Sequence, residues 1–361
     1  MQWLRERAHR NPWVAGFFDR ARERRRSRHF GEHLQASIGM AVRWRRREAA
    51  VACLCTQVSE LLAVRPPPPR KGSPSRITIR EPDLSRIEAA CRNPATIEIG
   101  ADELQAAARV ASLDPANVRA FQLYLAACWL HHEPLLASLR QVLSERIVIH
   151  MSCAPRLARA NLSIASFASQ RLPRVSHLKL IGNGDHSTFD AANGLLAVAA
   201  ADSYESLPQK MFQGLALLVM ACDPQCILKL DDDHRLRSAA ALTPLFDFAA
   251  ASREPMQMGQ INRVLIPSAH HRAWHFGKCV DPDLNERILA APTPLQWAAG
   301  SAGYLLNRPA LWRILWASLY YDRWLNEILY EDLALAEVAA KTGIRIVNAP
   351  LARAIGAVSE Y

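Results

Sequence analysis

The sequence has few cysteines and no long apolar run, and each shortage excludes a class of protein. Eight cysteines are spread over 361 residues, and the closest pairs, Cys53 with Cys55 and Cys222 with Cys226, lack the C-x-x-C spacing of zinc and thioredoxin sites. The small number and the spacing of the cysteines predict buried free thiols in a reducing compartment. No uninterrupted apolar run approaches the roughly 20 residues that span a bilayer, and the first residues lack the apolar core of a secretory signal. We therefore expect a soluble, cytoplasmic protein.

Most of the chain also lacks net charge. Of the formal charge of +10, residues 1–47 carry +9, with 13 Arg against four acidic residues. The nearly neutral remainder predicts no nucleic-acid partner. Two interpretations of residues 1–47 stay open. They could rest on an anionic membrane, which would place the protein peripherally on the inner face of the membrane, or form a solvated arm that binds a protein partner.

Changes in composition divide the chain into four segments. Residues 1–64 predict a basic helical region, and residues 65–76 a proline-rich linker. Residues 77–143 have alanine and larger apolar residues at helical spacing, which predicts a small tetratricopeptide-like helical module. Residues 144–361 alternate β-branched runs with helical patterns. We therefore predict an all-α N-terminal region followed by an α/β domain with a doubly wound, mixed or parallel sheet.

Three adjacent aspartates follow one predicted strand of this domain. The expected strands are RIVIHMSC (146–153), HLKLIGNG (177–184) and CILKL (226–230), with a helix over 207–220 between the last two. Ligands of such sheets bind outside the carboxyl ends of the strands. Asp231, Asp232 and Asp233 lie at such an end, so we expect them at a binding site.

The aspartates have three possible roles. In an extended segment, Asp231 and Asp233 point to one side and Asp232 to the other, which would leave a D-x-D pair for Mg²⁺ or Mn²⁺. Alternatively, the three form a solvated acidic turn. They could also cap the helix that is expected to begin near Ser238.

Five short motifs occur in a fixed order around these aspartates, and Arg159 fits a sixth, looser segment upstream. The matching residues are Asp202, Tyr204, Leu207 and Lys210; Lys229 with Asp231–Asp233; Arg272 and Lys278; Gly300, Gly303 and Tyr304; and Glu331 with Asp332. This ordered set resembles the β-1,3-glycosyltransferases of family 31, the galactosyltransferase and Fringe group. The resemblance covers roughly residues 145–356 and none of residues 1–140.

The resemblance implies a GT-A fold and a metal-dependent, inverting transfer. The sugar would pass from a nucleotide-sugar donor, most often a UDP-sugar, to a hydroxyl of a glycan acceptor, with Mn²⁺ or Mg²⁺ as cofactor. Asp233 would ligate the metal directly, and Asp231 would lie near the metal or the donor ribose. The other donor-binding residues that it implies are Asp232, Arg159, Asp202, Lys210 and Gly303. We take a bacterial surface glycan as the expected acceptor.

The resemblance also suggests the general base. Asp332 matches the family position of the base. Glu331 would either support the residues that contact the substrate or contact the acceptor itself. Without the resemblance, both acids would be interpreted as residues that favour the start of a helix.

One departure from the family leaves an alternative open. The family commonly supplies a histidine metal ligand near the end of the domain, and the tail after Asp332 contains no histidine. His234 is expected to be a poor substitute, because its strand direction should differ. The alternative is a catalytically weakened GT-A domain that acts as a binding or scaffold protein in glycan assembly.

Overall fold

The computed structural model divides the chain into two compact units, Met1–His132 and Glu133–Tyr361. The described residues are 100, 104, 108, 124–125, 127–129, 131–170, 172–263, 277–286, 296–325 and 328–357. The segments predicted at 1–64 and 65–76 lie outside the described residues, as does most of 77–143. The second unit begins with helix α7 (Glu133–Val142), one helix earlier than the boundary at 143/144 that the sequence predicts.

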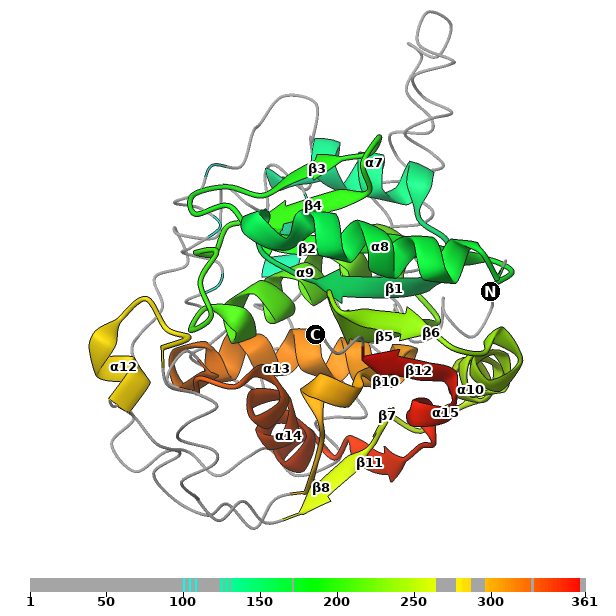
Figure 1. Ribbon diagram of the computed structural model, residues 1–361. Helices are drawn as coiled ribbons and strands as arrows, with labels where there is room; N and C mark the ends of the chain where they lie inside the picture. The colour runs from blue at the N-terminus through cyan, green and yellow to red at the C-terminus, as the bar shows by residue number, and fades with distance from the viewer. Residues whose placement is uncertain are drawn as a thin grey trace, which may run out of the picture. The chain divides into compact units, whose positions relative to one another are not determined.

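A mixed eight-stranded sheet forms the centre of the second unit (Figure 1), with the strand order β11-β7-β10-β5-β1-β2-β4-β3. Strands β5, β1, β2 and β4 are parallel, and β11 is parallel to β7. Strand β10 is antiparallel to β5 and β7, and β3 is antiparallel to β4. The strands are β1 (Arg146–Met151), β2 (Val175–Gly182), β3 (Thr188–Asp190), β4 (Leu195–Val198), β5 (Cys226–Asp231), β7 (Met256–Gly259), β10 (Tyr304–Asn307) and β11 (Arg345–Asn348).

Helices cover both faces of this sheet, with α8 in front and α9 behind in Figure 1. Two short ladders, β6 (His234–Leu236) with β12 (Ile355–Ala357) and β8 (Ile261–Arg263) with β9 (Gln296–Ala298), lie beside it. The remaining helices are η1 (Ala154–Arg156), α8 (Leu157–Ala168), α9 (Leu207–Cys222), α10 (Ala239–Ala251), α12 (Pro282–Glu286), η2 (Gly300–Ala302), α13 (Arg308–Leu325), α14 (Glu331–Thr342) and α15 (Leu351–Ala354). Among the described helices, none is both long and apolar enough to span a membrane.

The alternation of side chains in β5 decides which of its residues reach the site. Leu228 and Leu230 belong to a buried cluster that includes Phe167 of α8 and Phe246 of α10. Because successive side chains of a strand point to opposite faces, Lys229 and Asp231 lie on the other face. That face is covered by α9 and α13, which contact β2 and β5 respectively.

The predicted α/β architecture is confirmed, including the strands beginning near 146, 177 and 226 and the helix from Leu207. The register also brings two chain segments to the end of β5. Met151 of β1 pairs with Asp231, so Ser152 lies beside Asp232, and Tyr304 of β10 pairs with Lys229. The antiparallel β10 therefore places η2, which precedes it, at the same end of the sheet.

Candidate functional site

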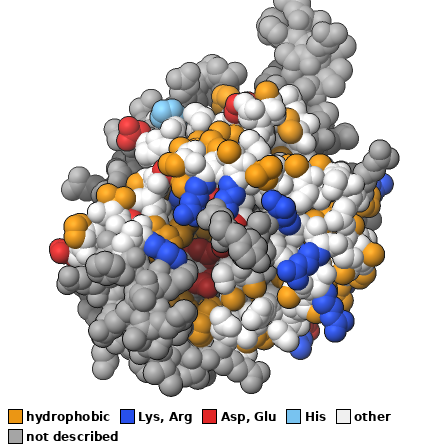
Figure 2. Space-filling model, viewed as in Figure 1, with side chains coloured by type: hydrophobic (Ala, Val, Ile, Leu, Met, Phe, Trp, Pro, Cys, Tyr) orange, Lys and Arg blue, Asp and Glu red, His pale blue; other side chains and the backbone are white. Residues whose placement is uncertain are grey.

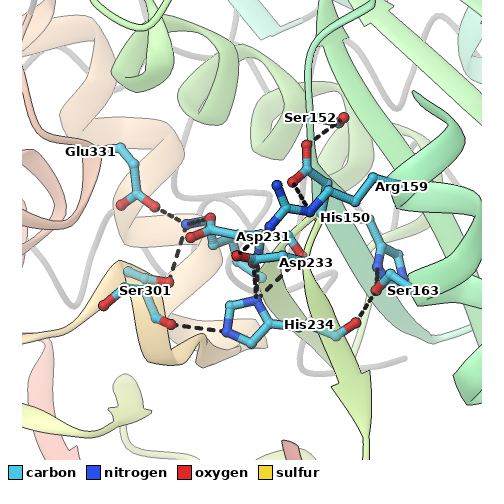
Figure 3. Close-up of polar contacts among 12 residues, drawn as sticks. His150, Ser152, Arg159, Ser163, Asp231, Asp233, His234, Ser301 and Glu331 are labelled. Atoms are coloured by element: carbon cyan, nitrogen blue, oxygen red, sulfur yellow. Dashed lines mark hydrogen bonds and ion pairs between the residues drawn. The ribbon is translucent and has the colours of Figure 1, made fainter. Parts of the chain in front are cut away.

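Asp231 ends β5, and Asp232 and Asp233 form the turn into β6. Figure 3 shows Asp231 and Asp233 beside His234. Asp232 is buried, and its carboxylate accepts a 2.9 Å hydrogen bond from Ser152 Oγ. The side chains of Asp231 and Asp233 are 39% and 30% exposed. Asp232 therefore lies in a different environment from Asp231 and Asp233, as the sequence predicts. The cause is different, because the chain turns after Asp231 instead of continuing as an extended strand.

Of the two alternative roles for the aspartates, the helix cap is wrong and the acidic turn holds only in part. Helix α10 is capped by Ser238, whose hydroxyl accepts a hydrogen bond from the Ala241 N–H at 3.2 Å. No aspartate of the triplet is therefore needed as a cap. A solvated acidic turn holds only in part, because Asp233 is 30% exposed but Asp232 is only 5% exposed. Burial raises the pKa of Asp232, and the Ser152 hydrogen bond opposes this shift.

Two cations from different elements neutralise the aspartates. Lys229 Nζ lies 2.8 Å from Asp231 Oδ1. Arg159 of α8 places Nη2 3.0 Å from Asp233 Oδ2 and Nε 3.7 Å from Asp232 Oδ1. Arg159, which the resemblance implies is a donor-binding residue, thus contacts two of the aspartates directly.

Lys229 also joins the aspartates to helix α14. Its ammonium forms an ion pair with Glu331, and the Tyr304 hydroxyl donates to Glu331 Oε2 at 3.3 Å. Burial opposes charge on Lys229, but Asp231 and Glu331 outweigh it and raise the pKa of the amine. Burial raises the pKa of Glu331 to about 7, against the opposing effect of Lys229. Glu331 is thus a buried partner of Lys229.

Asp332 lies at the start of α14 and accepts hydrogen bonds from two backbone N–H groups. Its Oδ2 accepts the Gly300 N–H at 3.0 Å and its Oδ1 accepts the Leu333 N–H at 2.9 Å. Burial raises the pKa of Asp332, while the Gly300 hydrogen bond and Lys229 lower it. Each carboxylate oxygen has a second lone pair, so these hydrogen bonds still leave acceptor capacity for a further proton.

Buried Lys210 forms an ion pair with the partly exposed Asp202. Lys210 is 1% exposed, and its Nζ lies 3.0 Å from Asp202 Oδ1. The Asp202 carboxylate also accepts the N–H groups of Ala154 and Gly182, at 2.6 and 3.0 Å. These contacts tie the segment after β1 and the end of β2 to the start of α9, because one carboxylate accepts hydrogen bonds from all three.

Gly303 is needed where η2 meets β5. Its φ is +76°, a conformation that residues with a Cβ rarely adopt, and an added Cβ would lie 2.6 Å from Leu230 Cδ2 and 3.0 Å from the Lys229 carbonyl oxygen. The predicted site glycine therefore permits close approach of η2 to the central strand.

His234 lies with the aspartates, which corrects an expectation from the sequence. The sequence predicts that the strand direction keeps the His234 ring away from a metal bound at the aspartates. In the structure, Asp231, Asp233 and His234 each place a ligand atom within 4.8 Å of the others. The ring already has backbone partners. Its Nε2 faces the Ser301 carbonyl oxygen at 2.9 Å and therefore carries a proton, and the Asp231 N–H donates to Nδ1 at 3.0 Å.

The site fits a hard divalent cation through its carboxylates. Asp231 and Asp233 lie close together and are partly exposed, and carboxylate oxygens are the ligands that Mg²⁺ and Mn²⁺ prefer. The His234 lone pair is engaged by Asp231, so the ring supports the turn in this arrangement. Sequence reasoning missed Ser152, because only the β1–β5 register brings it to Asp232.

Lys278, Tyr204 and Tyr330 form a further group of side chains near Asp231. The Lys278 ammonium lies 5.5 Å from the centroid of the Tyr204 ring, and Tyr204 meets Tyr330 edge to face. Burial and Arg156 lower the pKa of Lys278, whereas Asp231 raises it. Figure 2 shows acidic side chains at the base of a hollow, with Lys and Arg side chains along its rim. Arg272, which belongs to the same predicted motif as Lys278, lies outside the described residues.

Comparison with known proteins returns structural neighbours but no sequence relatives. No protein-family model matches the chain, and no curated protein matches it in sequence. A crystal structure of the galactosyltransferase LgtC in complex with donor and acceptor sugar analogues matches with 14% identity and a TM-score of 0.35, covering 56% of this chain and 73% of that one. An active-site mutant of LgtC matches with 14% identity and a TM-score of 0.32, covering 56% and 72%.

Proposed function

We propose that the second unit is a GT-A glycosyltransferase that uses a divalent cation and a nucleotide-sugar donor. The observation that carries this proposal is the convergence of two sets of carboxylates at one end of the sheet. Asp231 and Asp233 come from the end of β5, and Glu331 and Asp332 come from the start of α14. Lys229 joins the two sets through its ion pairs with Asp231 and Glu331.

The carboxylates after β5 have the chemistry of a site for a metal and a diphosphate. Asp231 and Asp233 would hold Mn²⁺ or Mg²⁺, and a cation bound there would neutralise charge on the leaving diphosphate. Arg159 supplies a guanidinium whose fork geometry suits phosphate oxygens. Asp232 would not contact the metal, because its buried carboxylate accepts a hydrogen bond from Ser152 and forms an ion pair with Arg159.

Asp332 is our candidate for the general base. A base must accept a proton from the acceptor hydroxyl as that hydroxyl attacks the anomeric carbon. Asp332 is half-buried and is oriented by the Gly300 and Leu333 N–H groups, with oxygen lone pairs still able to accept. Glu331 is less suitable, because it is buried against Lys229 and Tyr304. We assign Glu331 a positioning role that acts through Lys229.

The order of motifs supports a finer assignment. The resemblance to family 31 favours a UDP-sugar donor, inversion at the anomeric carbon and a β-1,3 linkage to a glycan hydroxyl. The edge-to-face pair of Tyr204 and Tyr330 is a surface against which a sugar ring could pack, since both rings are partly exposed. The alternative, a scaffold without turnover, is favoured by the engagement of the His234 lone pair, which leaves two carboxylates for the metal.

Thermal unfolding with nucleotides tests the proposal. Wild-type protein should be stabilised by UDP with Mn²⁺, by about 2.7 kcal/mol at a hundred times the dissociation constant. Asp233→Asn should lose this metal-dependent stabilisation, whereas Asp247→Asn, at the exposed ion pair with Arg146, should keep it. Equal stabilisation of wild type and Asp233→Asn would refute the metal site. Slow Mn²⁺-dependent hydrolysis of a UDP-sugar would separate an enzyme from a scaffold.

A further inference from the structure

We infer that Arg159 is an exchangeable internal counter-ion, which leaves Asp233 when a divalent cation binds and then contacts the donor diphosphate. This inference rests on the proposed function and adds a mechanism for coupling. Metal binding and donor binding would favour each other, because the same guanidinium opposes the first and promotes the second.

The two cations at the aspartates differ in their exposure to solvent. Lys229 is 3% exposed and is held by Asp231, by Glu331 and by the Gly300 carbonyl oxygen at 3.4 Å. Arg159 projects from α8 with a side chain that is 23% exposed. Its long aliphatic stem allows the guanidinium to shift while the helix stays in place. Arg159 is therefore the more accessible of the two cations to an incoming metal ion.

The guanidinium contacts its two carboxylates through different nitrogens. Nη2 lies 3.0 Å from Asp233 Oδ2, and Nε lies 3.7 Å from Asp232 Oδ1. Asp232 is buried and is held by the Ser152 hydroxyl at 2.9 Å, so it is a fixed anchor. Release of Asp233 therefore does not require Arg159 to leave the site. The Nε end can remain near Asp232 while the Nη2 end turns toward a new anion.

Charge makes this exchange most favourable when the divalent cation and the diphosphate are both bound. Without a metal, Arg159 offsets the repulsion between Asp232 and Asp233, since opposite charges within about 4 Å stabilise the ionised carboxylates. A divalent cation must compete with this ion pair, which weakens its affinity when it binds alone. A diphosphate supplies new acceptors for the released guanidinium, whose N–H groups match phosphate oxygens. By linkage, each ligand then raises the affinity for the other by the same factor.

The test is calorimetric titration of the full chain with MnCl₂ alone, then with UDP at saturating Mn²⁺. Arg159→Gln should bind Mn²⁺ about threefold more tightly than wild type, because a partly exposed competing ion pair is removed. The same variant should bind UDP at least about tenfold more weakly, because a charge-assisted hydrogen bond to phosphate is lost. The matched control is Arg345→Gln, which removes an exposed arginine paired with Glu254 on the edge strand β11 and should change Mn²⁺ affinity by less than about twofold.

The opposite signs of the two effects are what the inference requires. If wild type binds Mn²⁺ and Arg159→Gln binds it equally or more weakly, the exchange is refuted while the metal site stands. If wild type binds no Mn²⁺, the proposed function fails, and this inference fails with it.

A second variant covers the case in which Arg159→Gln does not fold, which circular dichroism would reveal. Arg159→Lys keeps the charge but lacks the second nitrogen, so it cannot hold Asp232 and a phosphate oxygen together. It should retain the Mn²⁺ affinity of wild type and lose most of the UDP-induced increase in that affinity. Full retention of the increase would overturn the inference.

Discussion

Lys229 Nζ lies 2.8 Å from Asp231 Oδ1, and the same ammonium forms an ion pair with Glu331. Lys229 and Asp231 are two residues apart in β5, so they lie on the same face of the sheet. Glu331 comes from the first turn of α14, about a hundred residues later. One buried cation therefore joins the carboxyl end of the central strand β5 to the start of the helix that carries Asp332.

Removal of this cation should be costly. Lys229→Met leaves Asp231 and Glu331 without their shared partner, and we expect a loss of about 3 kcal/mol in the free energy of unfolding at pH 8. Urea unfolding followed by circular dichroism measures this loss. The control is Arg345→Met at the exposed ion pair with Glu254, which should cost no more than about 1 kcal/mol. Equal small losses in both variants would contradict the bridging role of Lys229.

The assignment of the base predicts a separation between binding and turnover. Asp332→Asn should lower kcat for sugar transfer by at least about a hundredfold, because an amide cannot accept the acceptor proton. Its affinity for UDP with Mn²⁺ should stay near that of wild type. Glu331→Gln should retain more activity than Asp332→Asn. If transfer persists in Asp332→Asn and is lost in Glu331→Gln, the two roles are reversed.

The buried carboxyl of Glu331 predicts a pH dependence of stability. Burial raises its pKa from 4.5 to about 7. The folded state therefore binds this proton more tightly than the unfolded chain. The resulting stabilisation is complete below about pH 4.5 and is lost as the pH rises through about 7.

Comparison with Glu331→Gln isolates this contribution, because glutamine does not titrate. Between pH 5 and pH 8, wild type should lose about 2 kcal/mol in the free energy of unfolding relative to the variant. Urea unfolding at several pH values in EDTA provides the measurement, with the exposed Glu254→Gln as the control. A difference that stays constant with pH would show that Glu331 remains ionised throughout.

The basic segment predicts an interaction that depends on salt. Residues 1–47 carry +9 of the net charge, so the full chain should bind vesicles that contain phosphatidylserine at low ionic strength. Binding should weaken as salt screens the charges, and deletion of residues 1–47 should abolish it. Sedimentation with vesicles measures both effects, and neutral vesicles serve as the control. If the full chain does not bind anionic vesicles at low salt, a protein partner becomes the better hypothesis.

Much of the sheet could be predicted because its parallel strands are local patterns. The runs at Arg146–Met151 and Cys226–Asp231 are rich in apolar residues, and helical segments separate them. The antiparallel β10 was harder to predict, since its four residues are too few to establish a period. Its position next to β5 depends on pairing between Tyr304 and Lys229, which are far apart in the chain.

The sequence by itself determined the chemical content of the site: three carboxylates after a buried strand, two more before a helix, and Arg159 upstream. Only the tertiary structure decided how these charges are paired. In the folded chain, buried Asp232 accepts a hydrogen bond from Ser152, and Lys229 lies between Asp231 and Glu331. His234 lies beside Asp231 and Asp233. The physical reason is that patterns in a chain reflect local backbone geometry, whereas the pairing and the pKa of an ionised group depend on the distance to partners supplied by other elements.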